Sequence, residues 1–122
     1  MIKGISITII ADGIKNEEDS RFLADTLLKA LPAKTQYTAA QKYTKFPDAY
    51  KLEFTVPTSA DTTRQEQLYQ LHLLADRMAG PWLVYFDGAG NNTELIFNRD
   101  EHTRAAQPEF SSIRWALLQW IY

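Results

Sequence analysis

The stretch GPWLVYFDGAGNNTELIFN, residues Gly80–Asn98, decides how the rest of the chain is arranged. It holds two apolar runs, Trp82–Phe86 and Leu95–Phe97, on either side of a turn-rich segment from Asp87 to Asn92. Aromatic and β-branched residues bounded by glycine, aspartate and asparagine are typical of a β-hairpin. The first run does not alternate between apolar and polar residues, which indicates a strand covered on both faces. We therefore expect this hairpin to lie in the middle of a sheet.

Two further strands are predicted upstream by clean alternation of apolar and polar residues. The first spans about residues 2–11 and the second about 50–56, where Pro57 ends the ladder. The apolar members of the two strands are Ile5, Ile7, Ile9, Tyr50, Leu52, Phe54 and Val56. Residues 34–48 leave two possibilities open, an edge strand at about 35–43 or a long loop.

Three helices are predicted. Asn16 is a suitable N-cap for a helix over 17–31, and Pro32 ends it. A second helix over about 61–79 is followed by Gly80-Pro81, a combination that stops helices. A polar connecting loop from Arg99 to Pro108 leads to a third helix, which runs from about 108 or 109 to Tyr122. Its unusually wide apolar surface predicts either burial against the sheet or a protein-contact surface.

The predicted order of elements is therefore β-α-(β)-β-α-β-β-α in a single domain, residues 1–122. Strands that alternate with helices favour an α+β (α/β mixed sheet) architecture. We expect a βαββαβ core with an added hairpin strand and a C-terminal helix, in which three helices pack on a four- to five-stranded sheet.

Composition restricts the possible functions. The chain is 45% apolar and 23% charged, values typical of globular proteins. Its net charge of −2 lacks the basic excess of proteins that bind nucleic acid directly. With no cysteine there is no disulfide, thiolate metal site or thiol nucleophile. No apolar run reaches the length of a membrane span, about 20 residues, and the N-terminus does not have the pattern of a signal peptide, so a cytoplasmic location is expected.

No catalytic set is evident from motif spacing, and we predict no enzyme activity, cofactor or metal. The triplet Asp100-Glu101-His102 follows a strand, where catalytic groups often lie, but no motif spacing positions these groups, so a solvated loop is the favoured interpretation and a contact loop the next. His72 lies four residues before Asp76 on a predicted helix, and no third metal ligand is placed by the sequence. Gly88-Ala89-Gly90 lacks the glycine spacing and the following helix of a dinucleotide site.

Two segments carry a resemblance to a known group of proteins. They are NTELIFNRD, residues 92–100, and FSSIRWA, residues 110–116. Together with the size and character of the chain, they resemble the small immunity proteins of bacterial contact-dependent growth inhibition and related polymorphic toxin systems. The resemblance covers the C-terminal third of the sequence and includes no catalytic signature.

The resemblance implies a cytoplasmic protein that binds one cognate toxin C-terminal domain, frequently a nuclease, and blocks its active site or substrate cleft. A nuclease cleft is basic, so acidic and aromatic residues are the expected contacts. We predict six toxin-binding residues: Asp87, Asp100, Glu101, Trp115, Trp120 and Tyr122. Two alternatives remain, a homodimeric adaptor that uses the last predicted helix and a small enzyme that uses His72 with the Asp100-Glu101-His102 loop.

Overall fold

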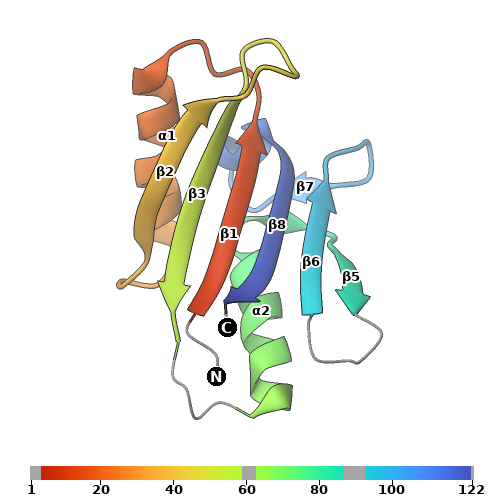
Figure 1. Ribbon diagram of the computed structural model, residues 1–122. Helices are drawn as coiled ribbons and strands as arrows, with labels where there is room; N and C mark the ends of the chain where they lie inside the picture. Colours follow the sequence, from red (N-terminus) through yellow and green to blue (C-terminus); the bar gives the residue numbers. More distant parts are fainter. Residues whose placement is uncertain (1–3, 59–62, 87–92, 122) are drawn as a thin grey trace.

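A computed structural model describes residues 4–58, 63–86 and 93–121 of the chain. Within these residues it has a six-stranded sheet, a two-stranded sheet, two α-helices and one short 3-10 helix (Figure 1). The elements are β1 (Gly4–Ala11), α1 (Glu17–Ala30), β2 (Gln36–Lys42), β3 (Tyr50–Pro57), α2 (Arg64–Asp76), β4 (Ala79–Gly80), β5 (Leu83–Phe86), β6 (Thr93–Asn98), β7 (Arg104–Ala105), η1 (Pro108–Ser112) and β8 (Ile113–Ile121).

The large sheet has the strand order β2-β3-β1-β8-β6-β5, and every neighbouring pair is antiparallel. Its first four strands belong to two units, β1-α1-β2 and a longer unit in which α2 and then strands β4 to β7 connect β3 to β8. In each unit the two strands are separated by a strand of the other unit, which is the split βαβ arrangement. The β5–β6 hairpin extends this four-stranded core beyond β8. Ile7 shows the register, because it pairs with Phe54 of β3 and Leu118 of β8.

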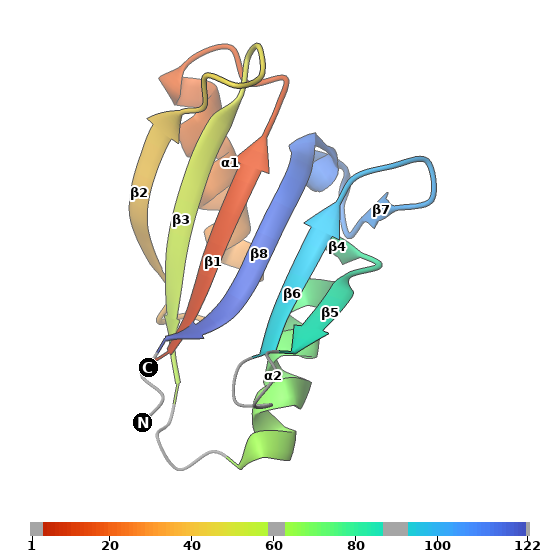
Figure 2. The ribbon, with the colours of Figure 1, turned by 45° about the vertical axis from the view of Figure 1, so that its right-hand side comes forward.

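Both helices lie on the same face of the large sheet, as the two views in Figures 1 and 2 show. α1 packs beside β2 and β3, and α2 packs beside β6 and β8. We call this the covered face, because its side chains form the core with one stripe from each helix. The largest fully buried members are Ile5, Ile7, Ile9, Leu27, Leu52, Phe54, Leu71, Met78, Leu95, Phe110, Ile113 and Leu118.

Local signals account for both helices. Asn16 caps α1 by accepting a hydrogen bond from the Asp19 N–H at 2.9 Å, as predicted. α2 begins with a capping box, in which Thr63 and Glu66 each accept a hydrogen bond from the other's backbone N–H. The predicted strands over 2–11 and 50–56 are present as β1 and β3, and the ambiguous segment forms an edge strand, β2. α2 ends at Asp76, before the predicted Gly80-Pro81 stop.

The predicted C-terminal helix is wrong. Residues 108–112 form η1, and residues 113–121 form β8, which lies between β1 and β6. The apolar residues that predicted a wide helix surface lie instead on the two faces of a central strand. Its residues alternate in burial, with Ala116, Leu118 and Trp120 facing the core. Tryptophan and isoleucine at both ends of this segment favour a strand, and neighbours on each side satisfy its backbone.

The α+β class is confirmed, but the predicted place of the hairpin and the predicted arrangement of sheet and helices are wrong. β5 is an edge strand, and β6 is second from the edge. The sheet is antiparallel rather than mixed and has six strands, and the described residues include two α-helices instead of three. The segment predicted as a connecting loop holds β7, which pairs with β4 in the two-stranded sheet. The predicted turn over 87–92 lies outside the described residues.

Candidate functional site

In the part of the chain that the structure describes, no helix lies on the face of the large sheet opposite α1 and α2 (Figures 1 and 2). We call it the open face. Strand residues alternate between faces, and directly paired residues share a face, so the register assigns each position. The open face holds Ser6, Thr8, Ile10, Gln36, Ala39, Gln41, Lys51, Glu53, Thr55, Leu83, Tyr85, Glu94, Ile96, Asn98, Trp115, Leu117, Gln119 and Ile121.

The open face changes character across the sheet. One row of paired residues runs from Glu53 and Thr8 to Leu117, Ile96 and Leu83. It is polar on β3 and β1 and apolar on β8, β6 and β5. We call the apolar part of the open face the apolar half; its residues are Ile10, Leu83, Tyr85, Ile96, Trp115, Leu117 and Ile121.

The apolar half is accessible to solvent at its outer edge. Leu83 is 55% exposed and Tyr85 is 50% exposed. Trp115, Leu117 and Ile96 are half-buried. Scattered exposed apolar residues are ordinary, whereas a contiguous apolar patch rimmed by polar residues marks an interaction surface. Aromatic residues in such a patch are the residue types that most often anchor protein interfaces.

A hollow of about 440 Å³ lies at the end of the open face where β8 begins and β6 ends. We call it the arginine hollow. Three aromatic residues and two arginines are among its lining residues, which are Ile10, Tyr43, Phe46, Asn98, Arg99, Arg114 and Trp115. Trp115 belongs to both the hollow and the apolar half, so the two form one continuous surface.

A β-bulge puts Arg114 in this hollow. Ile10 pairs with Trp115 and Ala11 pairs with Ile113, which leaves Arg114 as the extra residue of β8. Such a bulge redirects a side chain that would otherwise follow the alternation. The Arg114 guanidinium carbon lies 3.7 Å from the centroid of the Phe46 ring, a cation–π distance.

Asp12 is the carboxylate shared by the two arginines. Arg99 donates two hydrogen bonds to it, one from Nη1 to Oδ1 at 2.8 Å, and Arg99 also donates to the Ser111 carbonyl at 3.0 Å. Arg114 reaches Asp12 Oδ2 at 3.4 Å. These contacts, with Arg99 contributing most, hold the pKa of Asp12 below its ordinary value of 3.8. The same pair raises the pKa of Arg99.

The charge balance of the hollow leaves one cation in excess. Two guanidinium groups share one carboxylate, and Arg99 takes the better geometry. Among the described residues, the guanidinium group of Arg114 makes only one hydrogen bond, the one to Asp12. Its remaining N–H groups are therefore available to a carboxylate or a carbonyl group of a bound molecule, next to the Trp115 and Phe46 rings.

The structure describes four of the six predicted contact residues, and it does not place these four on one surface. Trp115 lies on the open face, but Trp120 faces the core and is 8% exposed, because the two residues are an odd number of positions apart on one strand. Asp100 and Glu101 are exposed in the loop after β6. Asp87 and Tyr122 lie outside the described residues.

The Asp100-Glu101-His102 loop has a local structural explanation. Asp100 Oδ1 accepts a hydrogen bond from the His102 N–H at 2.7 Å, and Thr103 Oγ1 accepts one from the Asp100 N–H at 3.0 Å. His102 is 81% exposed, and His72 lies on the exposed side of α2. Neither histidine lines the arginine hollow. No group of three potential metal ligands occurs among the described residues.

The reasoning from sequence missed most of the open face. Leu83 and Tyr85 were expected to be covered, and the segment that contains Leu117 was expected to be helical. The usable signal was the β-branched and aromatic content of residues 113–121, which favours a strand and therefore an alternating division of its side chains. Nothing in the sequence indicated that Asp12 would meet Arg114, because 102 positions separate them along the chain.

No helix among the described residues is long and apolar enough to cross a membrane. Comparison of the chain with protein-family models, with curated proteins and with solved structures gave no match.

Proposed function

We propose that this protein is a non-enzymatic immunity protein, which binds a bacterial toxin domain through the open face and blocks that domain's active site or substrate cleft. The observation that carries the proposal is the exposed apolar half, in which Leu83 and Tyr85 are at least half exposed and Trp115 also lines the arginine hollow. The resemblance of residues 92–100 and 110–116 to immunity proteins supplies the class of partner. A cytoplasmic location belongs to the same proposal.

The open face suits tight protein binding for two physical reasons. Removing one large apolar side chain from water contributes about 1.5–3 kcal/mol, and a few such residues near the centre of an interface carry most of its binding energy. In addition, all six strands of the large sheet are hydrogen-bonded to their neighbours, so the face is already formed before binding and little order has to be gained. A preformed face of this kind can exclude water from the rim of a cleft.

The contact residues of the proposal differ from those predicted from sequence. The proposed centre is Leu83, Tyr85, Ile96, Trp115 and Leu117. Asp100 and Glu101 remain as exposed charges of the neighbouring loop, where they would speed the capture of a basic toxin more than they would strengthen the complex. Trp120 is removed from the set because it belongs to the core.

A homodimer is the competing function, because the same apolar half can pack on a second copy. Two sheets pack face to face with their strands aligned, about 10 Å apart, when both faces are apolar. Sedimentation equilibrium measures this directly. A mass that rises with concentration in the wild type, and that Leu83→Lys reduces to the monomer mass, would favour the homodimer.

The test is to express the chain with the product of the adjacent upstream gene. We expect that product to be toxic alone, harmless with this chain and recovered with it in a one-to-one complex. Leu83→Lys and Trp115→Ala should each weaken the complex by about 30-fold or more, the effect of losing an interface hot spot. Thr55→Lys, on the polar part of the open face, is the matched control and should leave affinity unchanged.

Three results would reject the proposal. The neighbouring product could be harmless, the two chains could fail to associate, or the open-face variants could bind as tightly as the wild type while circular dichroism shows them folded. Weakened binding of Asp100→Ala and Glu101→Ala with unchanged binding of Leu83→Lys would keep the toxin partner and move the contact surface to the loop.

A further inference from the structure

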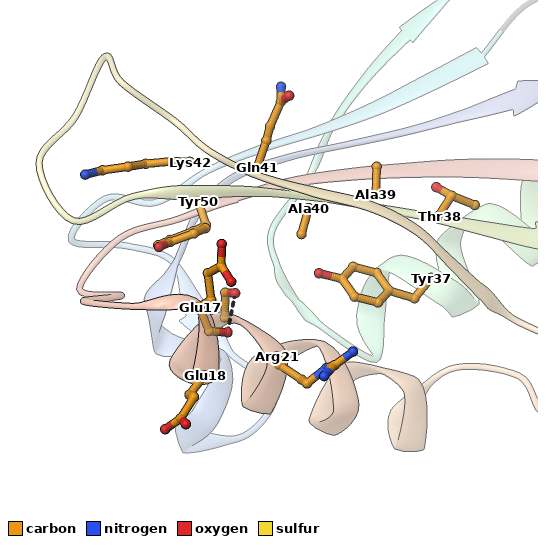
Figure 3. A pocket seen from close by; sticks show the side chains of 11 residues that line it. Glu17, Glu18, Arg21, Tyr37, Thr38, Ala39, Ala40, Gln41, Lys42 and Tyr50 are labelled. Carbon is orange, nitrogen blue, oxygen red and sulfur yellow. Dashed lines mark hydrogen bonds between the residues drawn. The ribbon is translucent and has the colours of Figure 1, made fainter.

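A second surface lies on the opposite side of the sheet from the apolar half. A groove of about 560 Å³ runs between α1 and β2, the edge strand at that side (Figure 3). Tyr37 and Ala40 point from β2 toward α1, whereas Ala39 and Gln41 point away from it. The full lining is Glu17, Glu18, Ser20, Arg21, Tyr37, Thr38, Ala39, Ala40, Gln41, Lys42 and Tyr50.

The backbone of β2 offers unpaired groups along this groove. Tyr43 donates its N–H to the Ala49 carbonyl at 2.8 Å, at the position in register just beyond the Lys42–Tyr50 pair. Residues of an antiparallel pair alternate between directing their N–H and C=O groups to the partner strand and away from it. Lys42 and Ala40 therefore direct these groups to the open edge, where another strand can bind them.

β2 carries few of the features that protect an edge strand from pairing. It has seven residues, Gln36–Lys42, with no proline, and the only charged residue is Lys42 at its end. A bulge shifts its register between Tyr37 and Ala39, so the regular part is Ala39–Lys42. The small Ala40 side chain leaves space beside α1, which a side chain of an added strand can fill.

The helix wall of the groove is acidic. Of the charged residues that line the groove, α1 supplies Glu17, Glu18 and Arg21, a balance of −1, and β2 supplies Lys42. Neither of the carboxylates that line the groove, Glu17 and Glu18, forms an ion pair with another described residue. At the other end of the groove, burial raises the pKa of Tyr37, so its hydroxyl group remains protonated and able to donate a hydrogen bond.

We infer that this groove binds an extended, basic segment of a partner protein, which adds to β2 as a seventh strand. Its backbone would exchange hydrogen bonds with Ala40 and Lys42. Its alternate side chains would enter the space beside Ala40, and a lysine or arginine would reach Glu17 and Glu18. Backbone pairing supplies affinity in this kind of recognition, and the pockets for alternate side chains supply specificity. The surface is separate from the open face, so the inference does not depend on the toxin proposal.

The experiment is selection from a library of displayed ten-residue random peptides against the whole folded chain, with counter-selection against the Ala40→Pro variant. This substitution removes one outward N–H and leaves the hydrogen bonds to β3 in place, because proline is tolerated at such an edge position. We expect the selected peptides to be rich in β-branched residues, to carry lysine or arginine, and to bind Ala40→Pro at least tenfold more weakly.

Two further measurements keep the inference testable if Ala40→Pro fails to fold. A double Glu17→Lys and Glu18→Lys variant leaves β2 intact and should bind the same peptides at least tenfold more weakly, with the loss decreasing at high salt. Amide hydrogen exchange at Ala40 and Lys42 should slow when the best peptide is bound, while exchange at Leu83 should not change. Trp115→Ala is the matched control and should bind the peptide like the wild type.

The inference is overturned if no selected peptide distinguishes the wild type from the edge or charge variants, or if exchange at Ala40 and Lys42 is unaffected by a bound peptide. If a bound peptide slowed amide exchange at Leu83 and Tyr85 instead, peptide binding would be assigned to the open face.

Discussion

The covered face and the open face of the large sheet are made by the same strands but carry different residues. On the covered face every one of β1, β3, β6 and β8 contributes buried apolar side chains, and both helices pack there. The open face is polar on β3, whereas its apolar residues lie mainly on β8, β6 and β5, beside Gln119, Glu94 and Asn98. The helices therefore cover most of the apolar surface on one side, where Val84 is 37% exposed, and on the other side the apolar surface remains in contact with solvent.

This difference separates side chains that hold the fold together from side chains available for binding. Leu117 and Leu118 are adjacent in β8, yet Leu118 is fully buried and Leu117 is half-buried on the open face. β8 carries apolar side chains on both faces, so burial of each face against another surface is favourable. The chain itself supplies one cover, and we propose that a partner supplies the other.

The largest expected effect is on core packing. Leu118→Ala should lower the free energy of unfolding by about 2–5 kcal/mol, because it removes buried methyl groups and leaves a cavity. The adjacent Leu117→Ala should lower it by less than about 1 kcal/mol, as expected for a residue outside the core. Urea denaturation followed by circular dichroism measures both. Equal losses would show that the open face is also part of the stabilising core.

The next effect concerns the carboxylate that links the ends of β1, β6 and β8. Asp12→Asn should lower the free energy of unfolding at pH 7 by about 1–3 kcal/mol, since it weakens charged hydrogen bonds to Arg99 and Arg114. Thermal and urea unfolding of the variant and the wild type give this difference. An unchanged free energy of unfolding would mean that water stabilises the two arginines as well as the carboxylate does.

The same carboxylate predicts a pH dependence with a definite sign. The pKa of Asp12 is lower in the folded chain than its ordinary value of 3.8, so the ionised form stabilises the fold. That contribution is complete above the unfolded-state pKa, and it disappears as the pH falls through the depressed folded-state pKa. Wild type should therefore lose more stability than Asp12→Asn between pH 5 and pH 2. Parallel pH profiles would contradict this.

A smaller effect is expected from the aromatic wall of the arginine hollow. Phe46→Leu keeps an apolar side chain but removes the ring beneath the Arg114 guanidinium, which lies 3.7 Å away. We expect a loss of about 0.5–1 kcal/mol, the value for an exposed cation–π contact. Repeating the measurement in the Arg114→Gln background provides the control, because the loss should then shrink.

The smallest effect should come from the polar part of the open face. Lys51 and Glu53 form an ion pair at 3.4 Å, and both side chains are about a third or more exposed. Glu53→Gln should change the free energy of unfolding by less than about 0.5 kcal/mol, because exposed ion pairs are screened by water and salt. A larger loss of stability at this position would show that the polar part of the open face also holds the fold together.

Elements whose signals are local could be predicted closely. The alternation of Ile5, Ile7 and Ile9 predicted β1, and the same pattern predicted β3. Asn16 and Pro32 bounded α1 correctly, because capping groups and the restriction before proline act within one turn of the chain. Of the predicted contact residues that the structure describes, only Trp115 lies on the open face.

The sequence by itself therefore determined the segments in which apolar residues recur at a clear period and local capping residues mark the ends. The tertiary structure alone decided that residues 113–121 form a central strand and that β5 lies at an edge, since both results depend on pairing between distant segments. An apolar run does not by itself indicate whether a helix, a strand or a partner will cover it. The meeting of Asp12 with Arg99 and Arg114 has the same origin, because the sheet order and one bulge bring them together.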